Sequence, residues 1–402
     1  MIMEALSNLR SFVSGAKSDA LLLLFTTAFI TPLCRLLHTS PILGYIASGI
    51  LLGPQGLGTI TDVHTTEHLA DLGIVFFLFE MGIHLNFDTL MEMRTDVFGL
   101  GMSQFTVTAL AIAAIVKLTG VGGGTVAAMV VLGGGLALSS SAFVLQLLRE
   151  KGEMKSRFGR ASFGVLLLQD LMVVPLLVLT PVLAKGGDLG AALGSALVRI
   201  GMALSAIAVL GKWVLRPVFD RVEASDSQEA FVGVMLGTVL SMSFLTEGLG
   251  LSNTLGAFLA GVLLSETKHR HRIEKELSPI RGILVGLFFF SVGFEVDLPL
   301  IMNKFGLVAG VVLGILCIKT VIAAAMGLAF GLDLGTSQHL GLVLSQGGEF
   351  AFVAFHMARD LEILNDETTR LMLTCVSLTM AFTPFLDGLG HKLNIQAHAK
   401  ES

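Results

Sequence analysis

The sequence predicts an all-α polytopic membrane protein whose spanning helices form an inverted-topology repeat, and three observations carry that prediction. Hydrophobic residues make up 53% of the 402 residues and charged residues only 14%, a balance far from that of soluble globular chains. Apolar runs of helix length recur along the whole chain. Several segments of the first half are also matched by segments of the second half.

The apolar runs are each near 20 residues, the length that a helix needs to cross a bilayer, and they predict about thirteen spans. The second and ninth runs are short and rich in glycine, which is typical of tilted or half-buried helices. The predicted spans lie near residues 20–38, 41–53, 66–86, 95–117, 125–148, 160–184, 189–214, 228–248, 252–266, 278–296, 304–331, 337–358 and 368–390.

The loops between the spans predict the orientation. Lysine and arginine gather within residues 149–160, 212–221 and 268–281, whereas residues 119–125 and 247–253 carry neither. The positive-inside rule places the basic loops on the cytoplasmic, stromal or matrix side. With thirteen spans, the C-terminus lies on that side too. We interpret these loops as determinants of topology and expect no nucleic-acid partner.

Motifs of soluble enzymes are missing from the sequence. It contains no nucleotide-binding glycine fingerprint, metal-ligand spacing or nucleophile elbow, and no Ser/His or paired-Asp catalytic arrangement. Cys34, Cys317 and Cys375 all fall within predicted spans, so no disulfide framework is expected. We therefore expect a protein that is not an enzyme and carries no cofactor. We also expect no cleavable signal peptide.

The internal repeat is the clearest guide to architecture. Six helices, one linking helix and six more helices place the second copy upside-down relative to the first, which is an inverted repeat. PILGYIASGILL at 41–52 matches NTLGAFLAGVLL at 253–264, FFLFEMGIHLNF at 76–87 matches FFFSVGFEVDL at 288–298, and LALSSSAF at 136–143 resembles LVLSQGGEFAF at 342–352. The matches align Gly44 with Gly256, Gly49 with Gly261 and Gly82 with Gly293.

Two repeat-equivalent segments are predicted to be broken helices. Serines interrupt the fifth span, and a polar, glycine-containing run interrupts the twelfth. Such breaks place positive and negative helix ends at the membrane midplane, where they favour an ion. The alternative is that these small residues only permit close helix packing. The residues concerned are Ser139, Ser140 and Ser141 in the fifth span and Ser345, Gln346, Gly347 and Gly348 in the twelfth.

Two charges within the spans have no repeat counterpart. Asp170, which follows Gln169 in an apolar stretch, aligns near Val376, and Lys319 aligns near Ile112. A carboxylate at this depth costs several kcal/mol unless something pairs with it, so it marks an ion path or a proton relay. We expect Lys319 to neutralise Asp170 when no cation is bound. A purely structural salt bridge, or an Asp that caps a kink near Pro175, is the alternative.

At these residues the chain resembles the Kef/KEA potassium/proton antiporters of the monovalent cation/proton antiporter superfamily. The similar stretches are Gln169–Asp170, LALSSSAFVLQLLREKGE at 136–153, GAFLAGVLLSET at 256–267 and LSQGGEFAFV at 344–353. The resemblance extends over essentially all of the predicted spans. Within the family, the sequences of these motifs are more similar to those of plastid KEA proteins than to those of enteric Kef proteins.

The resemblance implies a sodium/proton-antiporter-like fold that forms a homodimer in membrane lipid, with two crossed broken helices in a core that carries the ions. It also implies a nucleotide-binding regulatory domain, and the sequence up to Ser402 contains no such pattern. The implied division is 1–91 and 223–303 for dimerisation helices, 92–186 and 304–391 for core helices, 187–222 for the linker helix, and 392–402 for a tail on the cytosolic side.

The same resemblance assigns the site. Asp170 matches the carboxylate that binds K⁺ and H⁺, Gln169 its neutral neighbour, and Lys319 the basic partner. Ser139 to Ser141 lie on the first crossover, and Gln346 to Glu349 lie on the second.

We expect K⁺ and H⁺ to compete for Asp170 and only the neutralised site to cross the bilayer, which gives electroneutral exchange by alternating access. Two alternatives remain: an Na⁺/H⁺ antiporter, or a gated K⁺ channel without obligatory proton coupling, against which the absence of a TVGYG filter argues.

Glu80 and His84, one helical turn apart, form either a structural pair or a pH-tuning pair. A plastid thylakoid or envelope membrane and a bacterial inner membrane both suit such a chain.

Overall fold

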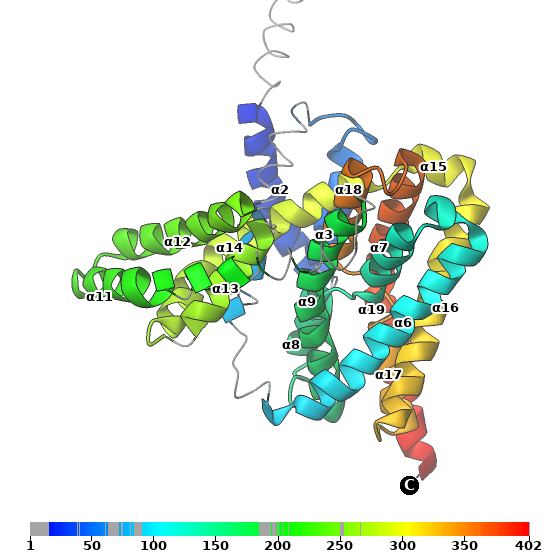
Figure 1. Ribbon diagram of the computed structural model, residues 1–402. Helices are drawn as coiled ribbons and strands as arrows, with labels where there is room; N and C mark the ends of the chain where they lie inside the picture. The colour runs from blue at the N-terminus through cyan, green and yellow to red at the C-terminus, as the bar shows by residue number, and fades with distance from the viewer. Residues whose placement is uncertain are drawn as a thin grey trace, which may run out of the picture. The chain divides into compact units, whose positions relative to one another are not determined.

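The computed structural model is all-helical over the residues that it describes, which confirms the predicted fold class (Figure 1). The described residues are 16–37, 39, 41–60, 62, 72–73, 75–80, 82–83, 91–184, 194, 198, 201–203, 205–207, 209–249, 253–265 and 267–401. The chain divides into two compact units, which we call unit 1 (Met1–Phe87 and Gly194–Phe294) and unit 2 (Asp88–Leu193 and Glu295–Ser402).

Each unit combines one segment from each half of the chain. Unit 1 contains α2 (Ala16–Leu36), α3 (Pro41–Leu52), the π-helix η3 (Gly211–Leu215), α11 (Arg216–Ala224), α12 (Gln228–Gly248), α13 (Asn253–Ser265), α14 (Arg270–Val292) and most of the 3₁₀ turn η4 (Gly293–Glu295). Unit 2 contains the π-helix η1 (Thr95–Gly101), α6 (Met102–Thr119), the 3₁₀ turn η2 (Val121–Gly124), α7 (Val126–Ala137), α8 (Ser141–Glu150), α9 (Arg157–Ala184), α15 (Leu298–Asn303), α16 (Phe305–Ala329), α17 (Leu334–Val343), α18 (Phe350–Asp360) and α19 (Asp366–Glu401).

The number of spans is not confirmed as thirteen. Six described helices are long and apolar enough to cross a membrane, or up to seven if a bent pair, Arg270–Ile280 and Gly282–Glu295, is one span. The span predicted near 189–214 overlaps one of these six helices, Gly201–Ala224, whereas the span predicted near 66–86 is only partly described. Two further spans are each divided into short helices, α7 with α8 and α17 with α18.

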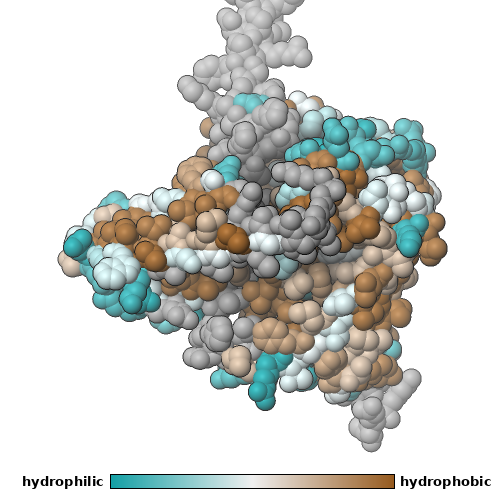
Figure 2. Space-filling model, viewed as in Figure 1, coloured by the Kyte–Doolittle hydropathy of each residue, from teal (hydrophilic) through white to brown (hydrophobic). Residues whose placement is uncertain are grey.

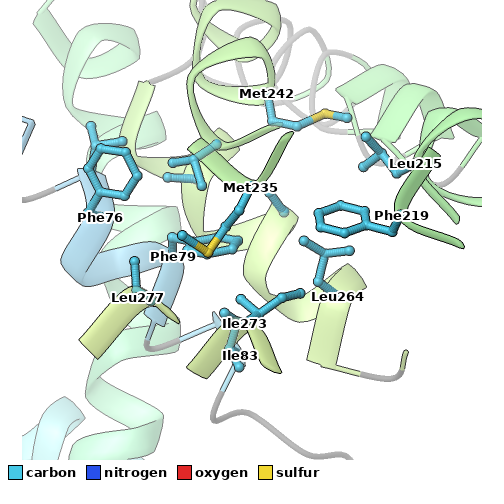
Figure 3. Packing of buried hydrophobic residues seen from close by; sticks show 14 of the residues in the cluster. Phe76, Phe79, Ile83, Leu215, Phe219, Met235, Met242, Leu264, Ile273 and Leu277 are labelled. Atoms are coloured by element: carbon cyan, nitrogen blue, oxygen red, sulfur yellow. The ribbon is translucent and has the colours of Figure 1, made fainter. Parts of the chain in front are cut away.

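Unit 1 is held together by an apolar core in which aromatic and branched side chains from several helices meet (Figure 3). Phe79 from the segment before residue 84, Phe219 from α11 and Phe231 and Met235 from α12 are all fully buried there. Between membrane helices such contacts act through van der Waals packing, because lipid tails are as apolar as the side chains. Figure 3 also labels Phe76, Ile83, Leu215, Met242, Leu264, Ile273 and Leu277.

Glycine lets α3 and the end of α14 approach at backbone distance. A Cβ atom on Gly49 would lie only 1.9 Å from the carbonyl oxygen of Phe290, and a Cβ on Gly293 would lie 2.4 Å from that of Ile46. Neither position has room for any side chain. The contact is reciprocal, since each glycine lies against the backbone of the other helix.

A second glycine pair repeats this contact elsewhere in unit 1. A Cβ on Gly261 would lie 2.1 Å from the carbonyl oxygen of Phe79, and a Cβ on Gly82 would lie 2.2 Å from that of Phe258. The sequence alignment equates these two glycines with the first pair. Each segment of one repeat therefore packs against the non-equivalent segment of the other. An inverted repeat with a pseudo-twofold axis produces this exchange.

In unit 2, α6 and α7 form a tight hairpin. Gly120 ends α6 in the left-handed conformation, with φ of 70° and its N–H donated to the Val116 carbonyl, which is a common helix end. Thr125 then caps α7 by accepting a hydrogen bond from the N–H of Ala128. Along the hairpin, a Cβ on Gly133 would lie 2.6 Å from the Ala109 carbonyl oxygen, so the two helices touch closely.

The N-terminal end of α9 is fixed by an ion pair between the exposed Arg157 and a buried carboxylate. Both terminal nitrogens of Arg157 donate to the two carboxylate oxygens of Asp96 at 2.8 Å, the two-pronged geometry that is strongest for this pair. Asp96 lies in η1 and is only 6% exposed. A Cβ on Gly164 would come within 2.8 Å of the Asp96 side chain, so η1 and α9 lie in contact.

Hydrophobic residues cover much of the visible surface of the described helices (Figure 2). Leu118 on α6, Phe29 on α2 and Phe385 on α19 are all largely exposed. Exposed apolar side chains on this scale are unfavourable in water and suit a surface that faces lipid.

Candidate ion-binding site

The first predicted broken helix is confirmed within unit 2. Helix α7 ends at Ala137, where Leu138 turns to an extended conformation with φ of −67° and ψ of 148°. Helix α8 begins at Ser141, and the hydroxyl of Ser140 accepts a hydrogen bond from the N–H of Phe143, as an N-cap does. Ser139, Ser140 and Ser141 are all buried, so the break lies inside the unit.

The second break crosses the first. Helix α17 ends at Val343 and α18 begins at Phe350. The Ser139 hydroxyl donates to the carbonyl of Leu344 at 2.7 Å, and the amide of Gln346 donates to the carbonyl of Ser140 at 3.3 Å. A Cβ on Gly348 would lie 3.0 Å from the Ser139 backbone, so the two irregular segments touch at this glycine.

Asp170 lies on α9 beside the start of α8. It is 5% exposed, and its two carboxylate oxygens accept from the hydroxyl of Ser141 at 2.9 and 3.0 Å. Ser141 is the first residue of α8. The N-terminal end of a helix carries a partial positive charge, which favours a carboxylate at that place.

Lys319 differs from the expectation that it pairs with Asp170. Its ammonium group is fully buried on α16 and donates to the carbonyl oxygens of Leu138 at 2.7 Å and Gln346 at 2.6 Å and to the Ser139 hydroxyl at 3.2 Å. An ammonium has three donors, so these oxygens satisfy it completely. Leu138 is the C-cap of α7, and the C-terminal end of a helix is negative. Each buried charge is therefore met by a helix end rather than by the other charge.

Glu349 places a second carboxylate at a helix start. It immediately precedes α18 as its N-cap residue and is only 2% exposed. Its charge also interacts with that of Asp170. The two acidic groups thus lie at the N-terminal ends of the two half-helices α8 and α18.

Gln169 is part of a buried chain of amides. Its side-chain oxygen accepts from the N–H of Ser139 at 2.8 Å, and its NH₂ donates to the side-chain oxygen of Gln104 at 2.8 Å. Gln104, on α6, donates in turn to the hydroxyl of Thr108 at 3.2 Å. Sequence reasoning missed Gln104 and Thr108. The signal available was a glutamine in an otherwise apolar run of helix length.

The remaining candidates from the sequence make no described hydrogen bond to Asp170 or Lys319. Gly347 donates its N–H to the Thr379 hydroxyl on α19 and so anchors the second break, whereas the hydroxyl of Ser345 donates to the Leu342 carbonyl in its own turn. Glu80 is buried in unit 1. His84 lies outside the described residues, so the pairing of Glu80 with His84 stays a prediction.

The site has the chemistry of a cation or proton site. Its centre is the Asp170 carboxylate, with that of Glu349 close enough to interact electrostatically, and the neutral oxygens around it belong to hydroxyl, amide and carbonyl groups, which suit a hard cation. Within the described part of the chain, no cationic side chain donates a hydrogen bond to Asp170.

Comparison with known proteins gives concordant results. The chain is 43% identical over 378 residues to the chloroplastic K(+) efflux antiporter 1 of Arabidopsis thaliana, covering 92% of this chain and 31% of that protein. It is 41% identical over 397 residues to the chloroplastic K(+) efflux antiporter 3 of the same plant, covering 93% of this chain and 51% of that protein. The chain thus spans about a third to a half of the curated relatives it matches.

A solved structure has the same fold. The sodium proton antiporter MjNhaP1 from Methanocaldococcus jannaschii superposes with a TM-score of 0.66 over 94% of each chain, at 15% sequence identity. The family described as sodium/hydrogen exchanger, transmembrane, matches residues 23–388. Together with the apolar helices, these findings identify an integral multi-pass membrane protein. The chain belongs to the transmembrane sodium/hydrogen exchanger family.

Proposed function

We propose that this chain exchanges K⁺ for H⁺ across a membrane by alternating access, with both ions competing for Asp170. The observation that carries the proposal is a buried carboxylate whose hydrogen-bond donor is a neutral hydroxyl, Ser141, while the nearby ammonium of Lys319 is committed to three other oxygens. The choice of K⁺ rests on the relatives, which are K(+) efflux antiporters by name.

Mutual exclusion follows from charge. An ionised Asp170 in a buried site is costly, and binding either a proton or K⁺ neutralises it. Both ions use the same carboxylate oxygens, so one leaves when the other binds. If only the neutralised site changes its access from one side to the other, the two fluxes are coupled one for one and the exchange is electroneutral.

The proposal extends to assembly and location. Unit 2 carries the ions, and unit 1 forms the contact in a homodimer surrounded by lipid. The basic loops and the C-terminus face the stroma or cytoplasm. The chloroplastic relatives favour a plastid membrane, and a bacterial inner membrane is the other setting.

Transport in proteoliposomes with a trapped pH dye tests the proposal. A proton gradient is imposed with the membrane potential clamped, and K⁺ or Na⁺ is then added to vesicles with wild-type protein or Asp170→Asn. We expect K⁺ to dissipate the gradient in the wild type and to have no effect in the variant. Asp360→Asn is the matched control, because Asp360 is an exposed carboxylate at the end of α18 and should leave transport unchanged.

Other outcomes overturn distinct parts of the proposal. Dissipation by Na⁺ alone would change the ion and identify an Na⁺/H⁺ antiporter. K⁺ flux without any proton signal would identify a channel. Full activity of Asp170→Asn would remove Asp170 from the centre of the mechanism.

A further inference from the structure

We infer that Gln104 is a positioning residue for the ion site: it fixes the side-chain amide of Gln169 and, through it, the crossover beside Asp170. The inference rests on the proposed function, because it concerns the site that binds K⁺. Gln104 does not touch Asp170 in its described hydrogen bonds and acts through Gln169.

The direction of the amide chain follows from one group that can only donate. The backbone N–H of Ser139 lies 2.8 Å from the side chain of Gln169, so an oxygen of that side chain must face it. The NH₂ of Gln169 then faces Gln104, which must present its own oxygen. The NH₂ of Gln104 consequently faces Thr108, whose hydroxyl accepts. One backbone N–H thus orients both amides.

Burial makes this order costly to disturb. Gln104, Gln169 and Ser139 are each 1% exposed, and Thr108 is fully buried. At this burial, bulk water does not replace a lost partner. An unpaired amide would therefore destabilise the folded protein by the full desolvation cost of a polar group. Without Gln104, the NH₂ of Gln169 has no described acceptor, so only the bond from the Ser139 N–H still holds the amide and its rotation away from Ser139 becomes less costly.

Rotation of Gln169 would reach the ion site through Ser139. The Ser139 hydroxyl donates to Leu344 and accepts from Lys319, so this residue joins the two breaks. Ser141, two residues further on, holds Asp170. The oxygen of Gln169 also accepts from the crossover backbone, so any second lone pair that it offers to K⁺ is held in place by this bond. A loosened Gln169 should therefore weaken K⁺ binding more than it slows the loaded carrier.

Kinetics and K⁺-dependent thermal stabilisation of the purified protein test the inference. The variants are Gln104→Leu, which keeps the approximate volume and removes the amide, and Gln104→Glu, whose protonated form can accept from Gln169 and donate to Thr108. Gln228→Leu is the matched control, because the Gln228 side chain is exposed on α12 in unit 1 and bonds to Glu276. We expect Gln104→Leu to raise the KM for K⁺ about tenfold, the effect of one lost buried hydrogen bond, with a smaller change in maximal rate.

The conservative variant separates positioning from simple structural support. Compared with the wild type at the same pH, we expect Gln104→Glu to recover most of the K⁺ affinity where the new carboxyl is protonated and to lose it as pH rises. The K⁺ concentration that stabilises the protein against heat should shift with KM in both variants. An unchanged KM for Gln104→Leu, or a fall in maximal rate and melting temperature alone, would overturn the inference.

Failure of the proposed function would be visible separately. If the wild type moves no protons with K⁺ but is stabilised by K⁺, the antiport proposal fails while the stabilisation curves still decide the role of Gln104. If K⁺ neither moves nor stabilises the wild type, both fail.

Discussion

Repeat-equivalent residues make equivalent contacts in unit 1 and different contacts in unit 2. In unit 1, the Gly49 contact with the Phe290 carbonyl is reproduced by Gly261 against Phe79. In unit 2, the equivalent serines diverge. Ser139 reaches across to the second break and to the ammonium of α16, whereas the hydroxyl of Ser345 bonds within its own turn.

The difference shows where symmetry ends. Glycine contacts involve only backbone atoms, so any two copies of the motif can reproduce them. The divergence in unit 2 begins at the side chains that lack a counterpart, Asp170 and Lys319. A buried ammonium needs three acceptors. One such group cannot serve two equivalent breaks in equivalent ways, so the two halves of the core differ around it.

The largest effect is expected from breaking the symmetric contact. Gly49→Ala places a Cβ 1.9 Å from the Phe290 carbonyl oxygen, and a backbone group cannot turn aside as a side chain does. Overpacking commonly costs about 1–3 kcal/mol, and we expect at least the upper end of this range here. The melting temperature in detergent and the yield of monodisperse protein measure it.

Gly261→Ala and Gly237→Ala complete this test. Gly261 is the repeat-equivalent position and should lose as much stability as Gly49, since its Cβ would lie 2.1 Å from the Phe79 carbonyl. Gly237, on α12, has open space where a Cβ would be, and alanine there should be neutral or slightly stabilising. Losses that differ widely between Gly49 and Gly261 would contradict the equivalence of the two contacts.

A double-mutant cycle sharpens the comparison at the unrepeated charges. Lys319→Met removes the donor from the Leu138 and Gln346 carbonyls, and we expect a net loss of about 2 kcal/mol because both are left buried. The ammonium and Asp170 share no hydrogen bond, and if the helix ends compensate each charge as the contacts indicate, adding Asp170→Asn should change this loss by less than about 0.5 kcal/mol. Chemical or thermal unfolding of the four proteins gives the coupling. Recovery of stability in the double variant would instead show that the two charges balance each other directly.

Several features of this core were accessible from the sequence because they depend on composition and order along the chain. The breaks at Ser139–Ser141 and Ser345–Gly348 follow from polar and glycine residues in apolar runs, and the fold class follows from the repeat. The partner of Lys319 was not accessible. Periodicity places a charge on a helix, but not the helix end that it meets in space. Opposite charges suggested a salt bridge, and two helix ends at a crossover offered each charge a closer partner.

The amide chain and the number of spans were missed for different reasons. Gln104 stands in an apolar run without a motif around it, and its meaning depends on the Gln169 side chain, which is distant along the chain. The span count assumes one continuous helix in each apolar run. A broken helix divides one apolar run into two short helices without changing its hydropathy, as α7 and α8 do.

The smallest effect is expected at the equivalent serines, and it tests the asymmetry most directly. Ser139→Ala removes a hydroxyl that donates to Leu344 and accepts from Lys319, and we expect a loss of about 1 kcal/mol together with a lower exchange rate. Ser345→Ala removes only a hydrogen bond to the Leu342 carbonyl within one turn. The variant should therefore lose only a few tenths of the stability that Ser139→Ala loses. The melting temperatures and K⁺-driven rates of both variants, measured side by side, give the comparison. Equal losses at the two positions would mean that the breaks are functionally symmetric despite their different contacts, and the asymmetry would then have to arise from Asp170 alone.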